Sequence, residues 1–287
     1  MGFCITVSWR YDRRMNHLRW ENLAPRVGWS GLIDEFDCWK EAGRVATLWW
    51  RDDDAAGPSS QLNRLLSISG EIPISLAVIP ADADAGLATW LVHPSRSHQT
   101  KRIAILQHGW RHKNHAVNGK KSEFPPERCR QAVASDLAAG RTKLAALFEV
   151  RALPVLAPPW NRFDCSFLPL LSACGLGAIS SVRPRQSARP APGIVAANVH
   201  VDLVAWAGAR GFIGERAALD GLIGHLRARR LAEVDAEEPT GILTHHLVQD
   251  EATDAFLRRL AAYTGAHRAA CWLDATEVFA DVVGSRP

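Results

Sequence analysis

Long apolar runs, tyrosine, methionine and closely spaced cysteines are all scarce in this 287-residue sequence. Apolar stretches such as residues 74–80 fall far short of the ~20 residues that a membrane-spanning helix needs, so we expect no membrane partner. The N-terminus is only briefly apolar before it becomes arginine-rich, the reverse of the order in a secretory signal, which favours a cytoplasmic protein. The six cysteines form no Cys-x-x-Cys pair and are too sparse for a disulfide scaffold, so cysteine chemistry is not expected.

A dense basic run is also missing. The 34 lysines and arginines are nearly balanced by 30 aspartates and glutamates, which leaves a net charge of +4. Proteins that bind nucleic acid usually concentrate positive charge on one surface, so nucleic acid is not an expected partner. Histidine and tryptophan are instead abundant, with 11 of each beside only two tyrosines. The positions of the histidines and tryptophans in the chain are therefore informative about function.

Short apolar runs rich in Val, Ile, Leu and Ala alternate with longer amphipathic stretches, which is typical of strand–helix units that build a parallel sheet. We expect strands at 45–50, 74–79, 103–107, 153–157, 177–182, 194–199, 241–244 and 270–273. We expect helices at 32–42, 61–67, 85–91, 126–148, 167–174, 216–234 and 251–263. This rhythm predicts an α/β fold, either a barrel of about seven or eight units or an open sheet. Residues 1–31 fall outside the rhythm and are interpreted as an N-terminal extension of a single domain, 32–287.

Histidines and aspartates gather where the expected strands end. In parallel α/β folds the loops at the carboxyl ends of the strands form the active face, so these clusters should converge in space. The general polarity of loops explains one or two such clusters, but not the repeated choice of His and Asp. The clusters are residues 52–54, His108 with His112, residues 158–160, His200 with Asp202, and His245 with His246.

Two of these clusters have the residue types of a metal site. Consecutive carboxylates such as those at 52–54 repel one another unless a cation or a hydrogen-bond donor offsets their charge. His108 and His112 are four residues apart, so on a helical turn they share one face and can bind one ion. With one aspartate they predict a site of two histidines and one carboxylate that keeps open positions for water. The alternative for the aspartates is a turn that caps the helix starting near Ser59.

The pair His245-His246 follows an apolar strand. Adjacent residues of a strand point in opposite directions, so at most one of the two faces the shared site, and we favour His245. The alternative is a buried histidine that is hydrogen-bonded to the backbone, which is the commoner fate of a single core histidine.

Five segments resemble, in order, the motifs of the polysaccharide deacetylases, carbohydrate esterase family 4. The usual motifs are T-F-D-D-G, H-[ST]-x-x-H, R-x-P-[YF]-G, D-x-x-D-W and L-x-H. Here they read Arg51-Asp-Asp-Asp-Ala55, His108-Gly-Trp-Arg-His112, Ala157-Pro-Pro-Trp-Asn161, Asp202-Leu-Val-Ala-Trp206 and Leu243-Thr-His245. The joint match in order is much more specific than any single motif. The resemblance implies an irregular (β/α)7 barrel.

The resemblance also implies a metal-dependent hydrolase that removes an acyl group, N-acetyl before others, from a small saccharide or related amide. One divalent ion, zinc before Co, Ni, Mn or Fe, would activate water and polarise the acyl oxygen. Asp54, His108 and His112 correspond to its ligands, and Asp53 to the general base. Because the Thr-Phe of the first motif is replaced, Asp52 with Asp53 is an alternative active pair.

Further positions carry over from the later motifs. His245 corresponds to the acid that protonates the departing amine, and the backbone N–H of Trp160 corresponds to an oxyanion donor. The rings of Trp160 and Trp206, together with Asp202, are expected to contact substrate because tryptophan faces stack on sugar rings. The alternative is that these rings fill the core and the rim of the barrel.

Two supporting residues of the family are missing. The arginine that holds the catalytic aspartate is Ala157 here, and the second aspartate of the fourth motif, which tunes the catalytic histidine, is Ala205. Arg111 and Arg162 are candidate substitutes for the arginine. These departures motivate one alternative function, a carbohydrate-binding barrel without turnover. A metal-dependent hydrolase of a non-sugar amide is another.

Overall fold

The computed structural model describes residues 28–93, 102–208 and 210–283. Its strands are β1 (Ala46–Ala55), β2 (Ile74–Val78), β3 (Ile103–Gln107), β4 (Ala152–Leu156), β5 (Ala178–Ile179), β6 (Val195–Ala196), β7 (Val201–Asp202), β8 (Val204–Ala205), β9 (Gly211–Phe212), β10 (Thr240–Thr244) and β11 (Ala270–Trp272). Its α-helices are α1 (Trp29–Glu41), α2 (Ser60–Ser69), α3 (Ala85–Val92), α5 (Arg130–Phe148), α6 (Leu168–Ala173), α7 (Glu215–Arg230), α8 (Glu251–Ala266), α9 (Ala275–Val278) and α10 (Ala280–Val283).

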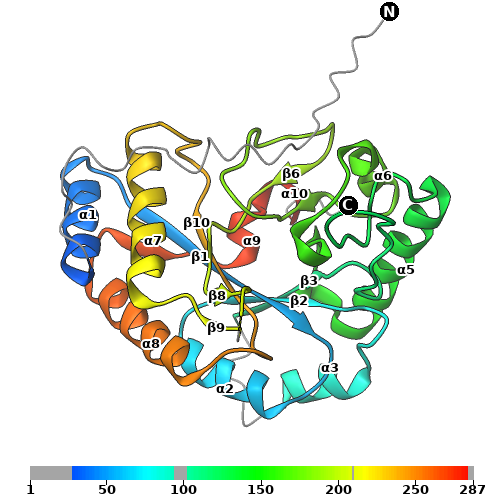
Figure 1. Ribbon diagram of the computed structural model, residues 1–287, viewed down its shortest axis with the longest axis horizontal. Coiled ribbons are helices and arrows are strands. Elements are labelled where there is room, and N and C mark those ends of the chain that lie inside the picture. Colours follow the sequence, from blue (N-terminus) through cyan, green and yellow to red (C-terminus); the bar gives the residue numbers. More distant parts are fainter. Residues whose placement is uncertain (1–27, 94–101, 209, 284–287) are drawn as a thin grey trace, which may run out of the picture.

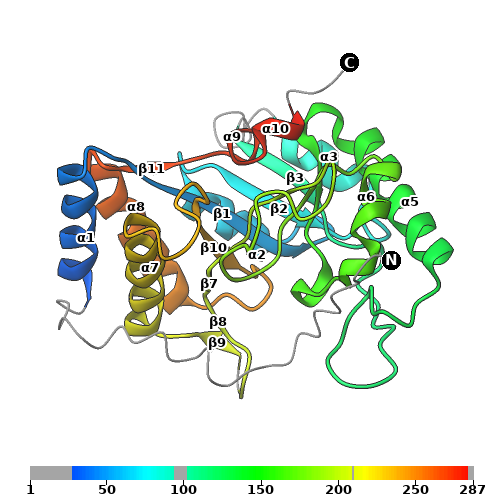
Figure 2. The same cartoon turned by 90° about the horizontal axis from the view of Figure 1, so that it is seen from above.

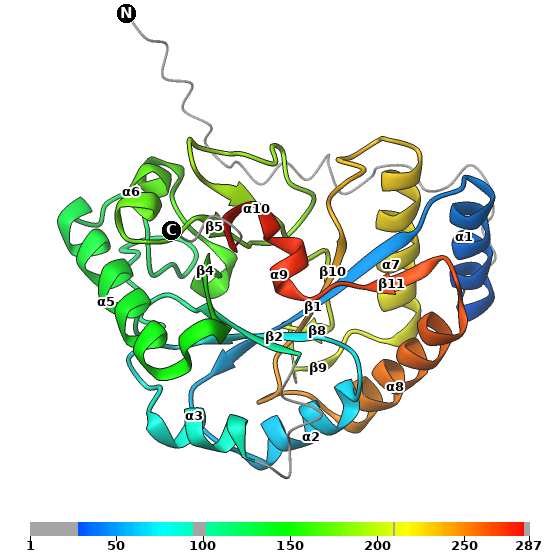
Figure 3. The ribbon, with the colours of Figure 1, turned by 180° about the vertical axis from the view of Figure 1, so that it is seen from behind.

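A curled parallel sheet forms the centre of the molecule. Its strands follow the order β6-β5-β4-β3-β2-β1-β10-β7, and β11 pairs with β1 beside β2. Helices surround the strands in Figure 1, and Figure 3 shows β11, α9 and α10 crossing the rear of the sheet. The antiparallel β8–β9 ribbon lies on the opposite side, as Figure 2 shows. The predicted α/β fold of irregular barrel type in a single domain is confirmed.

The central strand β1 is longer than the sequence pattern predicted. It was expected to end at residue 50, but it continues to Ala55 and contains all three aspartates. Asp54 has a φ of 71°, and the pairing of β1 with β2 shifts between Asp52 and Ala55. This is a bulge, in which one extra residue interrupts the regular alternation of side chains. The expectation that the aspartates follow the strand was wrong. A strand can continue through charged residues when their side chains find buried partners, as they do here.

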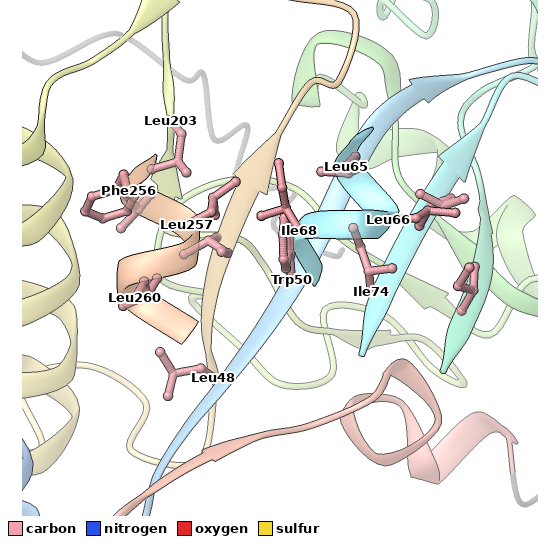
Figure 4. Packing of buried hydrophobic residues seen from close by; sticks show 14 of the residues in the cluster. Leu48, Trp50, Leu65, Leu66, Ile68, Ile74, Leu203, Phe256, Leu257 and Leu260 are labelled. Atoms are coloured by element: carbon pink, nitrogen blue, oxygen red, sulfur yellow. The ribbon is translucent and has the colours of Figure 1, made fainter. Parts of the chain in front are cut away.

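Alternation along β1 sends its two tryptophans into different cores. Trp50 packs with Leu48 and with helix side chains between the sheet and the outer helices, as Figure 4 shows. Trp49 belongs to the inner cluster, where small residues such as Ala77 and Ala104 leave room for its ring and for that of Phe279. Both indoles are almost fully buried, so these two tryptophans serve packing rather than binding.

Polar residues at helix starts fix several boundaries. Leu62 N donates to Ser59 Oγ at 3.0 Å, so Ser59 itself caps α2 and the aspartate cluster is not needed there. Asp84, Asp250 and Asp274 cap α3, α8 and α9 in the same way. Helix α1 begins earlier than expected, and residues 1–27 of the predicted extension lie outside the described residues. None of the helices in the described ranges is long and apolar enough to cross a membrane.

A second histidine cluster lies at the opposite end of β10 from His245. His200 Nδ1 accepts from Gly241 N at 2.9 Å, and its ring stacks on that of His225 at a centroid distance of 3.4 Å. Glu238 Oε2 lies 3.3 Å from His200 Nε2, and all three side chains are buried. The expectation that His200 joins the active face was wrong, because the chain between β6 and β7 returns to the start of β10.

The stacked histidines predict acid lability. Burial lowers the pKa of His200 from 6.5 to about 3, and it lowers that of His225 as well. Below pH 6.5 the unfolded chain therefore binds protons that the folded chain does not, so the free energy of unfolding falls as the pH is lowered. In His225→Gln we expect this fall to be shallower by about 1.4 kcal/mol per pH unit between about pH 6 and pH 4.

Denaturant unfolding at a series of pH values measures the two slopes. The free energy at pH ~8, where histidines are neutral, gives the cost of the substitution itself. Burial raises the pKa of Glu238 to about 7, but this group titrates in both proteins and largely cancels in the comparison. Equal slopes for the variant and the wild type would contradict the prediction.

Candidate active site

The carboxyl ends of the strands bring most of the predicted site residues to one face of the barrel. Asp53 and Asp54 come from the end of β1, and His245 directly follows β10. His108 directly follows β3, and Asp202 ends β7. Figure 2 shows the segment after β3 and the β8–β9 ribbon on this same side. Residues far apart in the sequence thus become neighbours, as expected for parallel strands.

Asp54, His108 and His112 converge on one point. Asp54 Oδ1 lies 3.2 Å from His108 Nε2 and 3.3 Å from His112 Nε2. One ligand atom from each of the three residues lies within 4.8 Å of the others. Two histidines and one carboxylate are a typical ligand set for zinc and related divalent ions.

The hydrogen bond made by His108 shows that these residues fit a cation. His108 Nδ1 lies 2.9 Å from the carbonyl oxygen of Ala157, which only accepts, so Nδ1 carries a proton. In the neutral ring Nε2 then presents a lone pair to Asp54 Oδ1, and two lone pairs at that distance repel unless a positive charge lies between them. Metal-binding histidines usually donate their other ring N–H to a carbonyl in this manner. The three side chains are therefore suited to hold a divalent ion.

The protonation states of Asp54 and His112 agree with that fit, whereas His108 has to lose a proton from Nε2 before it can bind an ion. Burial alone would raise the pKa of Asp54, but the hydrogen bond and charge of His108 hold it well below its usual range. Burial lowers the pKa of His112, and the neighbouring His108 lowers it further. Burial alone would lower the pKa of His108, but the carboxylates of Asp53 and Asp54 raise it, so in the absence of a metal ion a proton on Nε2 is the positive charge that faces Asp54. An ionised Asp54 and a neutral His112 near neutral pH are the forms that coordinate metal.

The segment from His108 to His112 is a loop and not the predicted helical turn. Gly109 and His112 have φ values of 64° and 52°, which turn the chain tightly. A Cβ at position 109 would meet Glu123 Oε2 at 1.9 Å, so only glycine fits there. The helical prediction was wrong because a tight loop can bring residues of the same spacing onto one point.

Glu123 holds this loop, and the sequence did not single it out. Its Oε1 accepts from Arg111 N at 2.8 Å and its Oε2 accepts from Trp110 N at 3.2 Å. Glu123 is buried, and burial raises the pKa of its carboxyl group. A single glutamate in a polar stretch carries no periodic or motif signal, so only the folded loop reveals which amides it meets.

Arg51 supplies the guanidinium that contacts Asp53. Arg51 Nε lies 2.9 Å from Asp53 Oδ1, and Nη2 donates to Asp53 Oδ2 at 3.1 Å. Both side chains are buried. The expected substitutes do not take this place: Arg162 donates to the carbonyl of Lys121 at 2.7 Å, and Arg111 is exposed. The expectation failed because the guanidinium comes from the same face of β1, two residues before Asp53, and not from the segments that follow β3 and β4.

Asp52 faces away from the cluster of metal-ligand candidates. Its Oδ2 accepts from Thr244 Oγ1 at 2.7 Å and from His246 N at 3.0 Å, and its Oδ1 lies 2.5 Å from His246 Nδ1. Burial alone would lower the pKa of His246, but Asp52 raises it. Asp52 therefore joins β1 to the end of β10. This geometry favours Asp53 and Asp54, rather than Asp52 and Asp53, as the pair at the site.

His245 lies between two carboxylates. Its Nε2 is 3.9 Å from Asp53 Oδ2, and its Nδ1 is 3.9 Å from Asp202 Oδ1. Asp202 Oδ2 also accepts from Trp206 Nε1 at 2.7 Å, and burial raises the pKa of the Asp202 carboxyl group. The family motif carries its second aspartate at the position of Ala205. In this chain the acid beside His245 Nδ1 is instead Asp202.

Trp160 and Trp206 flank the site on either side. The Trp160 ring lies 4.3 Å from that of His112, and the Trp206 ring meets that of His245 edge-on at 4.6 Å. Trp206 is 47% exposed, so its indole is available to a ligand. Trp160 and Asn161 share a φ of 55°, which makes a sharp left-handed turn after β4. The role of the Trp160 amide as an oxyanion donor stays a prediction.

Comparison with protein-family models and with curated proteins finds no match. A solved Mycobacterium smegmatis protein assigned as a polysaccharide deacetylase is similar over 85% of this chain and 95% of its own, with a TM-score of 0.57 and 16% identity. The catalytic domain of a peptidoglycan N-acetylglucosamine deacetylase from Eubacterium rectale matches 82% of this chain and 90% of its own, with a TM-score of 0.48 and 14% identity.

A family 4 acetyl xylan esterase from Clostridium thermocellum also matches 82% of this chain and 90% of its own, with a TM-score of 0.47 and 14% identity. At such low identity the likeness concerns the fold. The likeness to the Mycobacterium smegmatis protein shows that the chain has the fold of a solved protein assigned to the polysaccharide deacetylases, the family that its five motifs resemble.

Proposed function

We propose that this protein is a metal-dependent hydrolase that removes an acyl group, N-acetyl before others, from a small saccharide or a related amide. The observation that carries the proposal is the meeting of Asp54, His108 and His112 at one point, with Asp53 and His245 beside them. Metal-dependent hydrolysis of an amide needs a metal-ligand set with a general base and a general acid beside it, and a buried carboxylate and a histidine can fill these two roles. The similarity of fold to solved polysaccharide deacetylases supports the same reaction class.

Each residue has a defined task in this reaction. Asp54, His108 and His112 would hold a divalent ion, which would supply the Lewis acidity that makes water more acidic and polarises the acyl oxygen. Asp53 accepts the proton of the attacking water, because its carboxylate is an acceptor already oriented by Arg51. His245 is placed to protonate the departing amine.

The surroundings of the site support catalysis on a ring-shaped substrate. The half-exposed indole of Trp206 beside His245 offers a face on which a sugar ring can stack. The argument for a binding barrel without catalysis was the alanine at both positions 157 and 205. Arg51 weakens it by supplying a guanidinium to Asp53, and Asp202 weakens it by supplying a carboxylate beside His245. A hydrolase of a non-sugar amide shares all of these catalytic groups and differs only in the substrate.

Metal retention tests the ligand set. We expect purified wild-type protein to carry about one zinc or related divalent ion per chain, since three ligands are the usual protein contribution to a catalytic site. The His108→Ala, His112→Ala double variant should lose most of it, because one carboxylate alone binds such an ion weakly. Elemental analysis after dialysis measures the content. His115→Ala, in the same segment after β3, is the matched control and should keep its metal. Equal retention by the double variant would rule out these ligands.

Replacing Asp53 by Asn separates catalysis from binding. We expect the rate of acetate release from N-acetylated sugars to fall about 10²–10⁴-fold, because an amide cannot accept the proton. Metal content should stay near that of the wild type, since Asp54 is untouched. Asp220→Asn, an exposed substitution on α7, is the control and should leave the rate unchanged.

Assays of the wild type with N-acetylated sugars and with N-acyl compounds that contain no sugar distinguish the alternative functions. Sugar binding by the wild type without acetate release would identify a binding barrel. Release only from N-acyl compounds that contain no sugar would identify a hydrolase of another amide. Acetate release that survives in Asp53→Asn would remove this residue from the mechanism.

A further inference from the structure

We infer that Arg51 is a positioning residue. Its guanidinium fixes the general base, Asp53, and the left-handed turn at Trp160 in their positions relative to each other. The inference rests on the proposed function, in which Asp53 is the base. It concerns a residue to which the motif comparison gives no role, because the first motif of the family begins with threonine at this position.

The contacts of Arg51 join three parts of the barrel. Its Nε and Nη2 hold the Asp53 carboxylate, as described above. Its Nη1 donates to Ser180 O at 2.9 Å and to Ser180 Oγ at 2.8 Å, which anchors the guanidinium beyond the end of β5. Its Nη2 also donates to Asn161 Oδ1. One rigid, planar group thus fixes the base on β1 against β5 and against the turn after β4.

Asn161 matters because it follows Trp160 in a strained turn. Both residues have a φ of 55°, a region that L-residues other than glycine occupy at a cost. Asparagine tolerates that conformation better than most residues, and its side chain is fixed by Arg51. Ser181 Oγ donates to Asn161 O at 2.9 Å and holds the same turn from the main chain. The turn that presents the Trp160 amide is therefore tied to the group that orients Asp53.

The burial of Arg51 makes the arrangement rigid. Its side chain is 0% exposed and that of Asp53 is 2% exposed, so water cannot replace either partner. Alternation along β1 places Arg51 and Asp53 on the same face of the strand, two residues apart, and this explains why the guanidinium reaches this carboxylate. Lysine has one charged nitrogen in place of a planar fork and cannot make the same set of contacts.

The test compares Arg51→Lys with Arg229→Lys. Arg229 is a second buried arginine, whose Nη1 donates to Thr47 O at 2.8 Å and to Thr240 Oγ1 at 3.1 Å, away from the site. We expect kcat for acetate release to fall about 10–100-fold in Arg51→Lys, with KM and metal content near wild-type values, because the base and the turn at Trp160 lose their alignment while the metal-ligand candidates are untouched. Arg229→Lys should lower the melting temperature about as much as Arg51→Lys does, but it should keep the wild-type kcat.

Asn161→Ala tests the link to the turn. It leaves the Arg51–Asp53 pair intact and removes the side chain that joins the pair to Trp160. We expect a smaller loss of kcat in this variant, and in the Arg51→Lys, Asn161→Ala double variant a loss smaller than the product of the two single losses. Multiplicative losses would show that the two residues act separately and would overturn the link.

Crystal structures of wild type and Arg51→Lys give a result that does not depend on turnover. We expect the Asp53 carboxylate to leave its wild-type position and the turn at residues 159–161 to shift in the variant. If the wild type releases no acetate but these shifts occur, the proposed function fails and the positioning role stands. An unchanged kcat in Arg51→Lys, a loss of kcat that merely follows loss of metal, or an unmoved Asp53 overturns the inference. If Arg51→Lys does not fold, Ser180→Ala, which removes one anchor of the guanidinium, is measured in its place with the same expected direction.

Discussion

Two adjacent carboxylates can face one site only where a strand breaks its alternation. Asp53 and Asp54 are neighbours in β1, and in a regular strand their side chains would point to opposite faces of the sheet. The positive φ of Asp54 and the shifted pairing with β2 remove that restriction. The bulge therefore places Asp54 beside His108 and His112 while Asp53 contacts Arg51, which is the arrangement that the proposed reaction needs. The other groups of the site are arranged around this irregularity.

Buried charge in β1 is balanced locally. Arg51, Asp52 and Asp53 are consecutive and almost fully buried, which would cost several kcal/mol for each ion left unpaired. Alternation sends Asp52 to His246 and leaves Arg51 facing Asp53, so each charge has a partner on its own side of the strand. The same pairing that makes burial tolerable also immobilises the groups that the proposed reaction needs. Stability and orientation of the site thus depend on one set of contacts.

Departures from the family motifs look different once the fold is known. The motif positions 157 and 205 carry alanine, yet a guanidinium still contacts Asp53 and a carboxylate still lies beside His245. The guanidinium comes from Arg51, within the first motif itself. Compensation of this kind is invisible to a comparison of motifs read position by position, because it preserves a contact and not a residue at a given place.

The amino-acid sequence by itself determined the alternation of strands and helices and most of the residues that gather at strand ends, because periodicity and strand polarity are local properties of the chain. Periodicity left a barrel or an open sheet, and the barrel class came from the resemblance of the five motifs to a known family. The sequence did not determine the bulge at Asp54, the loop that folds His112 back beside His108, or the destination of the Arg51 side chain. It also misplaced His200, which belongs to the other end of the barrel. These features depend on contacts with other segments of the chain: β2 for the bulge, Glu123 for the loop, and Ser180 and Asn161 for the Arg51 side chain. Only the tertiary structure brings these segments together, because no periodic pattern in the sequence links them.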